Sequence, residues 1–267
     1  MSYMVEPNKF LLVDAGHTAI KLATLDRLGD PITLYYRDPT GDFRAQLRTL
    51  LKNLSPLVAI GCLPNASPIA EQLETILKTE VQYWERLRSE TAFECHEFTL
   101  KNGYSDPSSL GSDRWYAALG ALKNIKQAPL VIAQLGTATT VDVVKKISEG
   151  IFVFEGGHIV QGFEMMLGKL VEEIPSLQRV PGHIVPIPQS TADAIRTGAC
   201  EAQIGLRLRT VQKLGLPTQT QIAIGGGASS ELLPVLSEVF PCAMIKSDWV
   251  LEGLALKAYQ IRGELDG

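Results

Sequence analysis

Asp14–Lys21 is a short segment, DAGHTAIK, that combines an acid, a glycine turn, a hydroxyl and a base. Backbone N–H groups in such a turn can hold phosphate oxygens, and Gly16 lets the backbone approach them closely. Asp14 could hold Mg²⁺ directly or through water, while Lys21 would neutralise a phosphate. Taken alone, a segment of this kind is more often a solvated β-turn, because short Gly/Thr motifs are frequent. The chemistry that it offers is phosphate and Mg²⁺ binding.

A second segment, Gly136–Asp142 (GTATTVD), again combines a glycine turn, hydroxyls and an acid. The alternative is an ordinary hairpin turn, since Thr is a good strand residue. Two such loops, facing each other across a cleft, could hold the phosphate chain of one nucleotide from both sides. The run Gly225–Gly227 would let the backbone approach a purine or ribose, although a strand-to-helix turn explains it nearly as well.

A third candidate is the stretch from Tyr104 to Trp115, which contains an acid next to a base. Asp113 could accept a proton from an attacking hydroxyl, while the guanidinium of Arg114 binds a carboxylate or phosphate. The alternative is that Ser112 or Asp113 caps a helix and that Arg114 is solvated at the surface. For an isolated motif this alternative is the commoner case.

An internal repeat indicates the elements that position these residues. Phe10–Thr24 and Leu130–Val144 each consist of an apolar run, a glycine turn and a second β-prone run. Each predicts a β-hairpin, and a further strand follows at Ile32–Arg37 or Ile151–Glu155. The chain is therefore expected to contain two three-strand meanders.

After each meander the pattern predicts alternating helices and strands. Helices are expected at 42–54, 68–78, 165–177, 191–214 and 230–239 and from Asp113 onward, with strands at 57–62 and 221–224. This order predicts an α/β fold with a mixed sheet in each of two duplicated halves and a ligand cleft between them. The boundary is placed near Gly111–Leu122, giving domains 1–115 and 116–267.

The composition narrows the class of protein. The chain has 25 basic and 29 acidic residues, a net charge of −4 and no long basic run, so nucleic acid is not an expected partner. The four cysteines are widely spaced, which predicts neither a metal site nor a disulfide framework. The first residues do not resemble a secretory leader, and no apolar stretch approaches membrane-spanning length. A cytoplasmic protein without membrane association is expected.

In their order and spacing, the motifs resemble those of type III pantothenate kinases, which belong to the superfamily of acetate and sugar kinases, heat-shock chaperone ATPases and actin. The resembling segments are DAGHTAIK at 14–21, YSDPSSLGSDR at 104–114, LGTATTVD at 135–142, GGHIVQG at 156–162, STADAIRTGA at 190–199 and IGGGA at 224–228. The resemblance implies two duplicated ribonuclease H-like (actin-like ATPase) domains. It also implies transfer of the γ-phosphate of ATP, with Mg²⁺, to pantothenate, the first step toward coenzyme A, by a homodimer.

The same resemblance implies roles for individual residues. Asp113 would be the catalytic base, and Arg114 would face the anionic end of the substrate. ATP would be bound by Asp14, Ala15, Gly16, His17, Thr18, Ala19, Ile20, Lys21 and Thr137, and pantothenate by Tyr104, Gly111, Ser112, Asp113, Arg114 and Thr191.

Two residues depart from the family pattern. His17 stands where the family usually has Asn, and His differs from Asn in bulk and in titration. Gln134 stands where the family typically has an Asp that binds an activating potassium or ammonium ion. A neutral amide removes a charge from that site, so a weaker or absent requirement for K⁺ is expected.

Two rival functions remain open from the sequence. One is an actin-like kinase for another small alcohol or a sugar, which would share the phosphate loops and differ around Tyr104, Arg114 and Thr191. The other is a non-catalytic nucleotide-binding regulator. The joint presence of a base and the other site residues argues against the regulator, because a binding module has no need of a base; these residues are Asp14, Asp113, Arg114 and Thr137.

Overall fold

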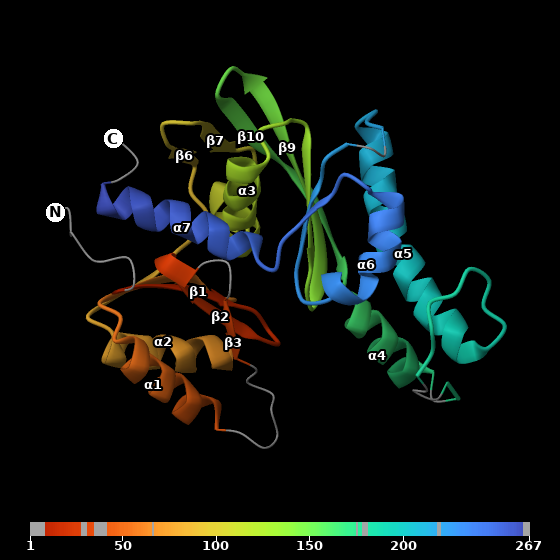
Figure 1. The fold of residues 1–267 in the computed structure, drawn as a ribbon, viewed down its shortest axis with the longest axis horizontal. Coiled ribbons are helices and arrows are strands. Elements are labelled where there is room, and N and C mark those ends of the chain that lie inside the picture. Colours follow the sequence, from red (N-terminus) through yellow and green to blue (C-terminus); the bar gives the residue numbers. More distant parts are fainter. Residues whose placement is uncertain are drawn as a thin grey trace. The chain divides into compact units, whose positions relative to one another are not determined.

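The computed structural model describes residues 9–27, 31–34, 42–65, 67–174, 176–177, 181–217 and 220–263. The chain forms two compact units (Figure 1). Unit 1 comprises Met1–Lys126, Lys146–Phe154 and Asp248–Gly267, and unit 2 comprises Gln127–Lys145 and Glu155–Ser247. In the described part of the chain, no helix is both long enough and apolar enough to cross a membrane.

A five-stranded sheet forms the centre of unit 1, in the order β3-β2-β1-β4-β5. β1 (Phe10–Ala15), β2 (Ile20–Thr24) and β3 (Ile32–Leu34) are antiparallel neighbours, which confirms the first predicted meander. β4 (Val58–Cys62) is parallel to β1, and β5 (Tyr83–Arg86) is parallel to β4. Residues 35–37 of the predicted third strand lie outside the described residues.

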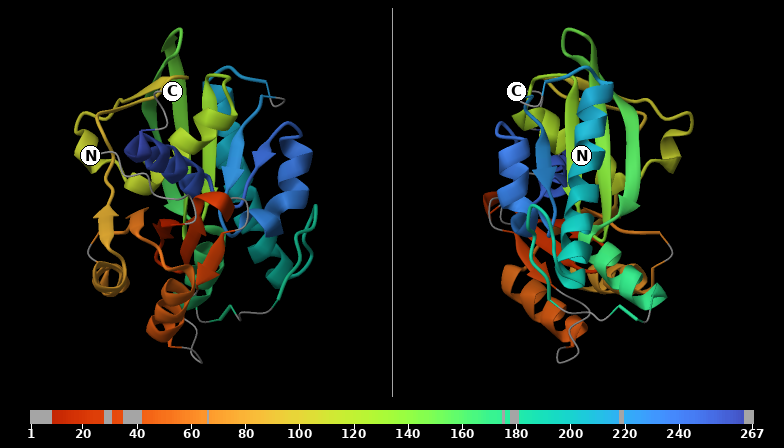
Figure 2. Two further views of the ribbon diagram at one scale, coloured as in Figure 1. Left: turned by 60° about the vertical axis from the view of Figure 1, so that its left-hand side comes forward. Right: turned by 90° about the vertical axis from the view of Figure 1, so that its right-hand side faces the viewer.

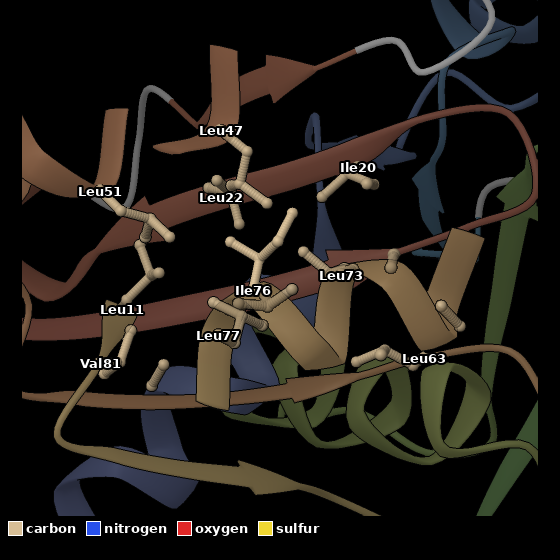
Figure 3. Close-up of a cluster of buried hydrophobic side chains, with 14 of the residues drawn as sticks. Leu11, Ile20, Leu22, Leu47, Leu51, Leu63, Leu73, Ile76, Leu77 and Val81 are labelled. Atoms are coloured by element: carbon tan, nitrogen blue, oxygen red, sulfur yellow. The ribbon is translucent and has the colours of Figure 1, made fainter. Parts of the chain in front are cut away.

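Two amphipathic helices, α1 (Phe43–Leu54) and α2 (Pro68–Glu80), cover one face of this sheet. Figure 3 shows side chains of both helices directed toward the strands. Leu11 and Val13 belong to this core cluster. Because successive strand residues point to opposite faces, Leu12 and Asp14 point to the other face of the sheet. The alternation along β1 thus fixes the side on which Asp14 lies.

That other face of the sheet packs against α7 (Trp249–Arg262), which in turn packs against α3 (Ser112–Asn124). The backbones of the two helices are in direct contact at two glycines. A Cβ atom on Gly253 would overlap the carbonyl oxygen of Tyr116, and one on Gly120 would overlap that of Trp249. These two glycines therefore allow α3 to lie directly against α7, which in turn contacts β1 and β4.

The pattern that predicts the other helices does not identify α7, for a physical reason. Almost every residue from Trp249 to Leu256 is buried, so α7 has no polar stripe and no helical periodicity of hydrophobicity. The remaining elements of unit 1 are short: β6 (Ala92–Glu94), β7 (Thr99–Asn102) and two 3₁₀ turns at Leu25–Arg27 and Pro107–Ser109.

The second sheet has the order β12-β11-β8-β9-β10-β7-β6. Its strands are β8 (Leu130–Leu135), β9 (Ala138–Ser148), β10 (Ile151–Gln161), β11 (Ala223–Gly225) and β12 (Met244–Ile245), together with β6 and β7. β8 is antiparallel to β9 and parallel to β11, and β11 is parallel to β12. The hairpin predicted at Leu130–Val144 is therefore present.

Three helices of unit 2 are α4 (Phe163–Glu173), α5 (Thr191–Lys213) and α6 (Ser229–Val239), and α5 lies against both α4 and α6 (Figure 2). Alternate residues of β8, beginning with Val131, pack with these helices in one apolar cluster. α4 ends earlier than the predicted helix at 165–177. The next residue, Ile174, precedes a proline in the sequence, and the residue before proline disfavours helical angles.

The two sheets share one topology. The first has the order β3-β2-β1-β4-β5, and the equivalent strands of the second follow as β10-β9-β8-β11-β12. In each, a hairpin strand pairs in parallel with the fourth strand, and the fifth pairs in parallel with the fourth. The predicted α/β fold with a duplicated mixed sheet is confirmed. α3 belongs wholly to unit 1, and the domain boundary after residue 115 stays a prediction.

Candidate active site

The segment Asp14–Lys21 forms the tip of the β1–β2 hairpin. The turn is closed by the Gly16 N–H, which donates to the carbonyl oxygen of Ala19 at 2.9 Å. Asp14 is buried, whereas Gly16, His17 and Thr18 are exposed. The strand register pairs Asp14 with Lys21. The hairpin therefore presents an exposed turn above a buried acid and its cross-strand base.

Asp14, Lys21 and Asp248 form an ion cluster at the base of this turn. Lys21 Nζ donates to Asp248 Oδ2 at 2.5 Å and to Asp14 Oδ2 at 3.2 Å. Asp248 is also the N-cap residue of α7, because its Oδ1 accepts the N–H of Leu251 at 3.0 Å. One carboxylate thus joins the start of α7 to β2.

The cluster carries more negative than positive charge. Burial and the carboxylates of Asp248 and Asp113 raise the pKa of Asp14 to about 7, although Lys21 opposes this shift. Burial by itself would lower the pKa of Lys21, but Asp14 and Asp248 raise it above its ordinary value. Lys21 is therefore a fixed cation, while Asp14 sits in surplus negative charge that an incoming cation would relieve.

Asp113 lies in the first turn of α3 and is exposed. The N-cap residue of α3 is Gly111, without a side-chain cap, so the helix-cap interpretation of Ser112 and Asp113 is wrong. A Cβ on Gly111 would lie 2.5 Å from Asp113 Oδ1, so glycine makes room for this carboxylate. Asp113 is close enough to the hairpin for its charge to raise the pKa of Asp14.

Cys62 lies beside Asp14 in the strand register and belongs to the same surroundings. Burial raises the pKa of the Cys62 thiol well above its ordinary value, and a hydrogen bond with Ser112 opposes the shift. This cysteine is therefore a neutral thiol rather than a nucleophilic thiolate.

Arg114 is buried, in contrast to its exposed neighbour Asp113. Its Nη1 donates to the hydroxyl of Tyr104 at 2.8 Å. The guanidinium carbon lies 5.7 Å from the ring centre of Tyr104 and 5.6 Å from that of Phe154. The interpretation of Arg114 as a solvated surface residue is therefore wrong, and Tyr104 and Arg114 are brought together.

Two residues that the sequence analysis missed hold the loop between Tyr104 and α3. Asn102 accepts the N–H of Tyr104 at 3.1 Å, and its amide donates to the carbonyl oxygen of Pro107 at 3.2 Å. Ser89 Oγ donates to the carbonyl oxygens of Pro107 and Leu110 at 2.7 and 2.9 Å. Their partners are backbone groups, so no side-chain motif in the sequence could have indicated them.

The second predicted phosphate loop lies in unit 2, between β8 and β9. Its turn is closed by the Gly136 N–H, which donates to the carbonyl oxygen of Ala138 at 3.1 Å. Thr139 Oγ1 donates to Gln203 Oε1 at 2.6 Å and ties the hairpin to α5. The Gly162 N–H donates to the carbonyl oxygen of Thr137 at 2.9 Å. The loop that carries Thr137 is thus fixed from two sides.

Gln134 occupies the position in β8 that Asp14 occupies in β1. It pairs with Thr140 across the hairpin, as Asp14 pairs with Lys21. Gln134 Nε2 and Thr140 Oγ1 are buried and have no hydrogen-bond partner among the described residues. The second hairpin therefore presents a neutral pair where the first presents an ion pair.

The other predicted residues of unit 2 are less distinctive. Thr191 is exposed at the first position of α5, next to the N-cap residue Ser190. Gly226 has a φ of 98° and no room for a Cβ against the backbone of Leu135. Packing therefore explains Gly226, whereas an added Cβ on Gly227 would meet no atom within 4 Å.

A sequence profile of one protein family, described as Type III pantothenate kinase, matches residues 10–213. The chain belongs to this family. The matched range contains every residue to which the resemblance assigned a role in binding or catalysis, including Thr137 and Thr191. Asp248 lies outside it. The sequence offers only the cap signal of an acid before an apolar run, and Lys21 is 227 positions away.

Curated type III pantothenate kinases are similar to this chain. The protein of Azoarcus sp. (strain BH72) is 34% identical over 61% of this chain and 59% of its own length. That of Nitrosospira multiformis is 30% identical over 91% of this chain and 88% of its own length. That of Paracidovorax citrulli is 27% identical over 95% and 99%. The match thus spans about three fifths of the Azoarcus protein and nearly all of the last two.

A solved structure supports the fold. A protein of Campylobacter jejuni, described as a conserved putative Baf family transcriptional activator, superposes with a TM-score of 0.58. The superposition covers 96% of this chain and 100% of that chain, at 19% sequence identity. At this identity the likeness concerns the fold alone.

Proposed function

We propose that this chain transfers the γ-phosphate of ATP to the hydroxyl of pantothenate, the first step of coenzyme A synthesis. One observation carries the proposal beyond family membership. Asp113 lies in the first turn of α3, and its exposed carboxylate is within electrostatic reach of Asp14, the residue of β1 that precedes the exposed hairpin turn. Phosphoryl transfer requires this combination, a phosphate-binding turn beside one group that can accept the proton of the nucleophile.

The proposed reaction assigns a role to each part of unit 1. The exposed turn from Gly16 to Ala19 binds ATP phosphates, and Asp113 accepts the proton of the pantothenate hydroxyl. The hydroxyl oxygen bonds to the γ-phosphorus as the bond to the bridging oxygen breaks, and ADP leaves. Arg114, held by Tyr104, faces the pantothenate carboxylate. The roles of Thr137 in ATP binding and Thr191 in pantothenate binding stay predictions.

The residues around Asp14 fit a magnesium ion that arrives with ATP. Mg²⁺ is commonly held by one or two carboxylates together with substrate phosphates. Besides burial, the carboxylates of Asp248 and Asp113 raise the pKa of Asp14, and Lys21 is the one cation among these four groups, so a divalent cation would neutralise surplus negative charge there. Asp14 would hold the ion directly or through water, and the ion would offset charge on the transferred phosphoryl group.

The residues at the equivalent place in unit 2 do not fit a monovalent cation. Gln134 offers a neutral amide, whose Nε2 is buried without a hydrogen-bond partner among the described residues, and so lacks the negative charge that an aspartate would contribute to a cation site. We therefore infer a weak or absent requirement for K⁺ or NH₄⁺.

An assay of ADP release tests the proposed function. The purified chain is incubated with MgATP and either pantothenate, other hydroxy acids or sugars. ADP release that depends on pantothenate, with phosphopantothenate identified by mass spectrometry, is expected. Release with a sugar alone would favour the rival kinase. ATP binding without release for any acceptor would favour the regulator. Light scattering after size exclusion tests the proposed homodimer on the same sample.

A further inference from the structure

The carboxylate of Asp248 has a second oxygen and a negative charge that its role as a helix cap does not require. One oxygen, Oδ1, accepts the Leu251 N–H and completes the cap. A neutral Asn or Ser caps a helix about as well as Asp. The charge and the second oxygen are therefore not explained by capping, and the second oxygen accepts from Lys21.

Burial makes this charge costly. The Asp248 side chain is only 2% exposed. By comparison, Asp42 caps α1 in the same unit, accepts the Arg44 N–H at 2.9 Å and lies at the surface. Taking a carboxylate out of water is unfavourable unless a partner and hydrogen bonds compensate for it. Asp248 therefore needs Lys21 to be charged where it is.

The position of Lys21 depends in turn on Asp248. Its ammonium is 2.5 Å from Asp248 and 3.2 Å from Asp14, so the closer acid is the one outside the hairpin. With Asp248 neutral, Asp14 would be the remaining acid in the pair of salt bridges at this ammonium. Lys21 would then move toward Asp14, and the Asp14 carboxylate would neutralise the positive charge of the ammonium.

We propose that Asp248 is a positioning residue that holds the Lys21 ammonium beside the phosphate hairpin and prevents it from pairing fully with Asp14. The inference rests on the proposed function of this hairpin in ATP binding. It has two opposite consequences. The charge of Asp248 opposes the binding of ATP phosphates, whereas the fixed position of Lys21 favours their reaction.

The variant Asp248→Asn separates these consequences, because Asn keeps the cap and removes the charge. Turnover, kcat, is expected to fall about tenfold or more, because small misplacements of a charged group in a phosphate site are expensive. The Kd of ATP without magnesium is expected to fall about fivefold, because one buried negative charge is gone. The melting temperature should change little. Asp42→Asn, a matched cap variant, should alter none of these quantities.

A double-mutant cycle tests whether Asp248 acts through Lys21. In a Lys21→Met background, adding Asp248→Asn should change kcat by less than about twofold, because no ammonium remains to be positioned. Equal effects of Asp248→Asn on kcat in both backgrounds would overturn the inference. A wild-type kcat and Kd in Asp248→Asn itself would do the same.

Two further choices keep the test decisive. If Asp248→Asn does not fold, Asp248→Ser retains a cap acceptor and carries the same expectation. If the wild-type chain does not phosphorylate pantothenate, the proposed function fails, but the Kd of metal-free ATP still tests the inference. The change in Kd caused by Asp248→Asn is then compared in the wild-type and Lys21→Met backgrounds. A difference of more than about twofold between the backgrounds supports the inference, and equal changes overturn it.

Discussion

At the scale of residues, neighbouring side chains of one motif have different environments. Asp113 is exposed and Arg114 is buried, although they are adjacent in the first turn of α3. Exposure leaves Asp113 free to meet a substrate hydroxyl, whereas burial fixes the guanidinium of Arg114 against Tyr104. Asp14 is buried, and the charged groups that act on it are the carboxylates of Asp248 and Asp113 and the ammonium of Lys21. The amino-acid sequence of the motifs does not distinguish the environments of these three side chains.

Asp113→Asn is expected to lower turnover about 100-fold or more, because Asn cannot accept the proton of the attacking hydroxyl. The melting temperature should stay the same, because the side chain is exposed and does not cap α3. Steady-state kinetics and thermal unfolding measure both. Glu71→Gln, an exposed acid in the first turn of α2, is the matched control and should have normal turnover. Normal turnover in Asp113→Asn would contradict the assignment of the base.

The pH dependence of stability should depend on Asp14. Its pKa is raised from 3.8 to about 7, so the folded chain holds this proton more tightly than the unfolded chain. The resulting stabilisation is complete below pH 3.8 and is lost as the pH rises through about 7. The groups around Asp14 that contribute charge are Asp248, Asp113 and Lys21.

Asp14→Asn removes this titration. Without metal or nucleotide, the stability of the variant relative to the wild type should increase by on the order of 2 kcal/mol between pH 5 and pH 8. Urea unfolding of both proteins at the two pH values gives this difference. Parallel pH profiles would show that Asp14 is ionised in the folded chain throughout this range.

At the scale of elements, the site in unit 1 depends on close contact between α3 and α7. Gly120 and Gly253 allow the helix backbones to touch. This contact places Asp248 at the start of α7 and Asp113 at the start of α3 near the same hairpin. The hairpin fixes the relative positions of two of the charged residues, since pairing of β1 with β2 sets Lys21 opposite Asp14.

Gly253→Ala is expected to destabilise the chain by about 1–3 kcal/mol, because the new methyl group overlaps the carbonyl oxygen of Tyr116. Turnover should fall as well, since α7 must move away from α3. Gly205→Ala in α5 is the control, because an added Cβ there meets no atom within 4 Å. It should stabilise the chain by up to about 1 kcal/mol. Chemical denaturation compares the two, and equal effects would contradict the proposed packing.

At the scale of the whole molecule, duplication of the sheet produced two hairpins with different chemistry. Strand order and register make Gln134 and Thr140 the counterparts of Asp14 and Lys21. The first pair is charged and the second is neutral. Only the first can attract a cation by charge, which is the basis for the expected independence from K⁺.

Adding K⁺ at constant ionic strength should change turnover less than about twofold. Gln134→Asp should restore an anionic ligand and with it activation by K⁺. Initial rates in KCl are compared with rates in a salt of a large organic cation, for both proteins. Steep activation of the wild type by K⁺ would contradict the role inferred for Gln134.

The sequence by itself determined the fold class, the hairpins, most helices and the family, because each leaves a local pattern of hydrophobicity, glycines or motif letters. It also located Asp14, Lys21 and Asp113. The tertiary structure alone decided that Asp248 completes the cluster and that Arg114 is buried. The contact between Lys21 and Asp248 joins residues 227 positions apart and depends on how α7 packs. A local pattern holds no information about such a contact.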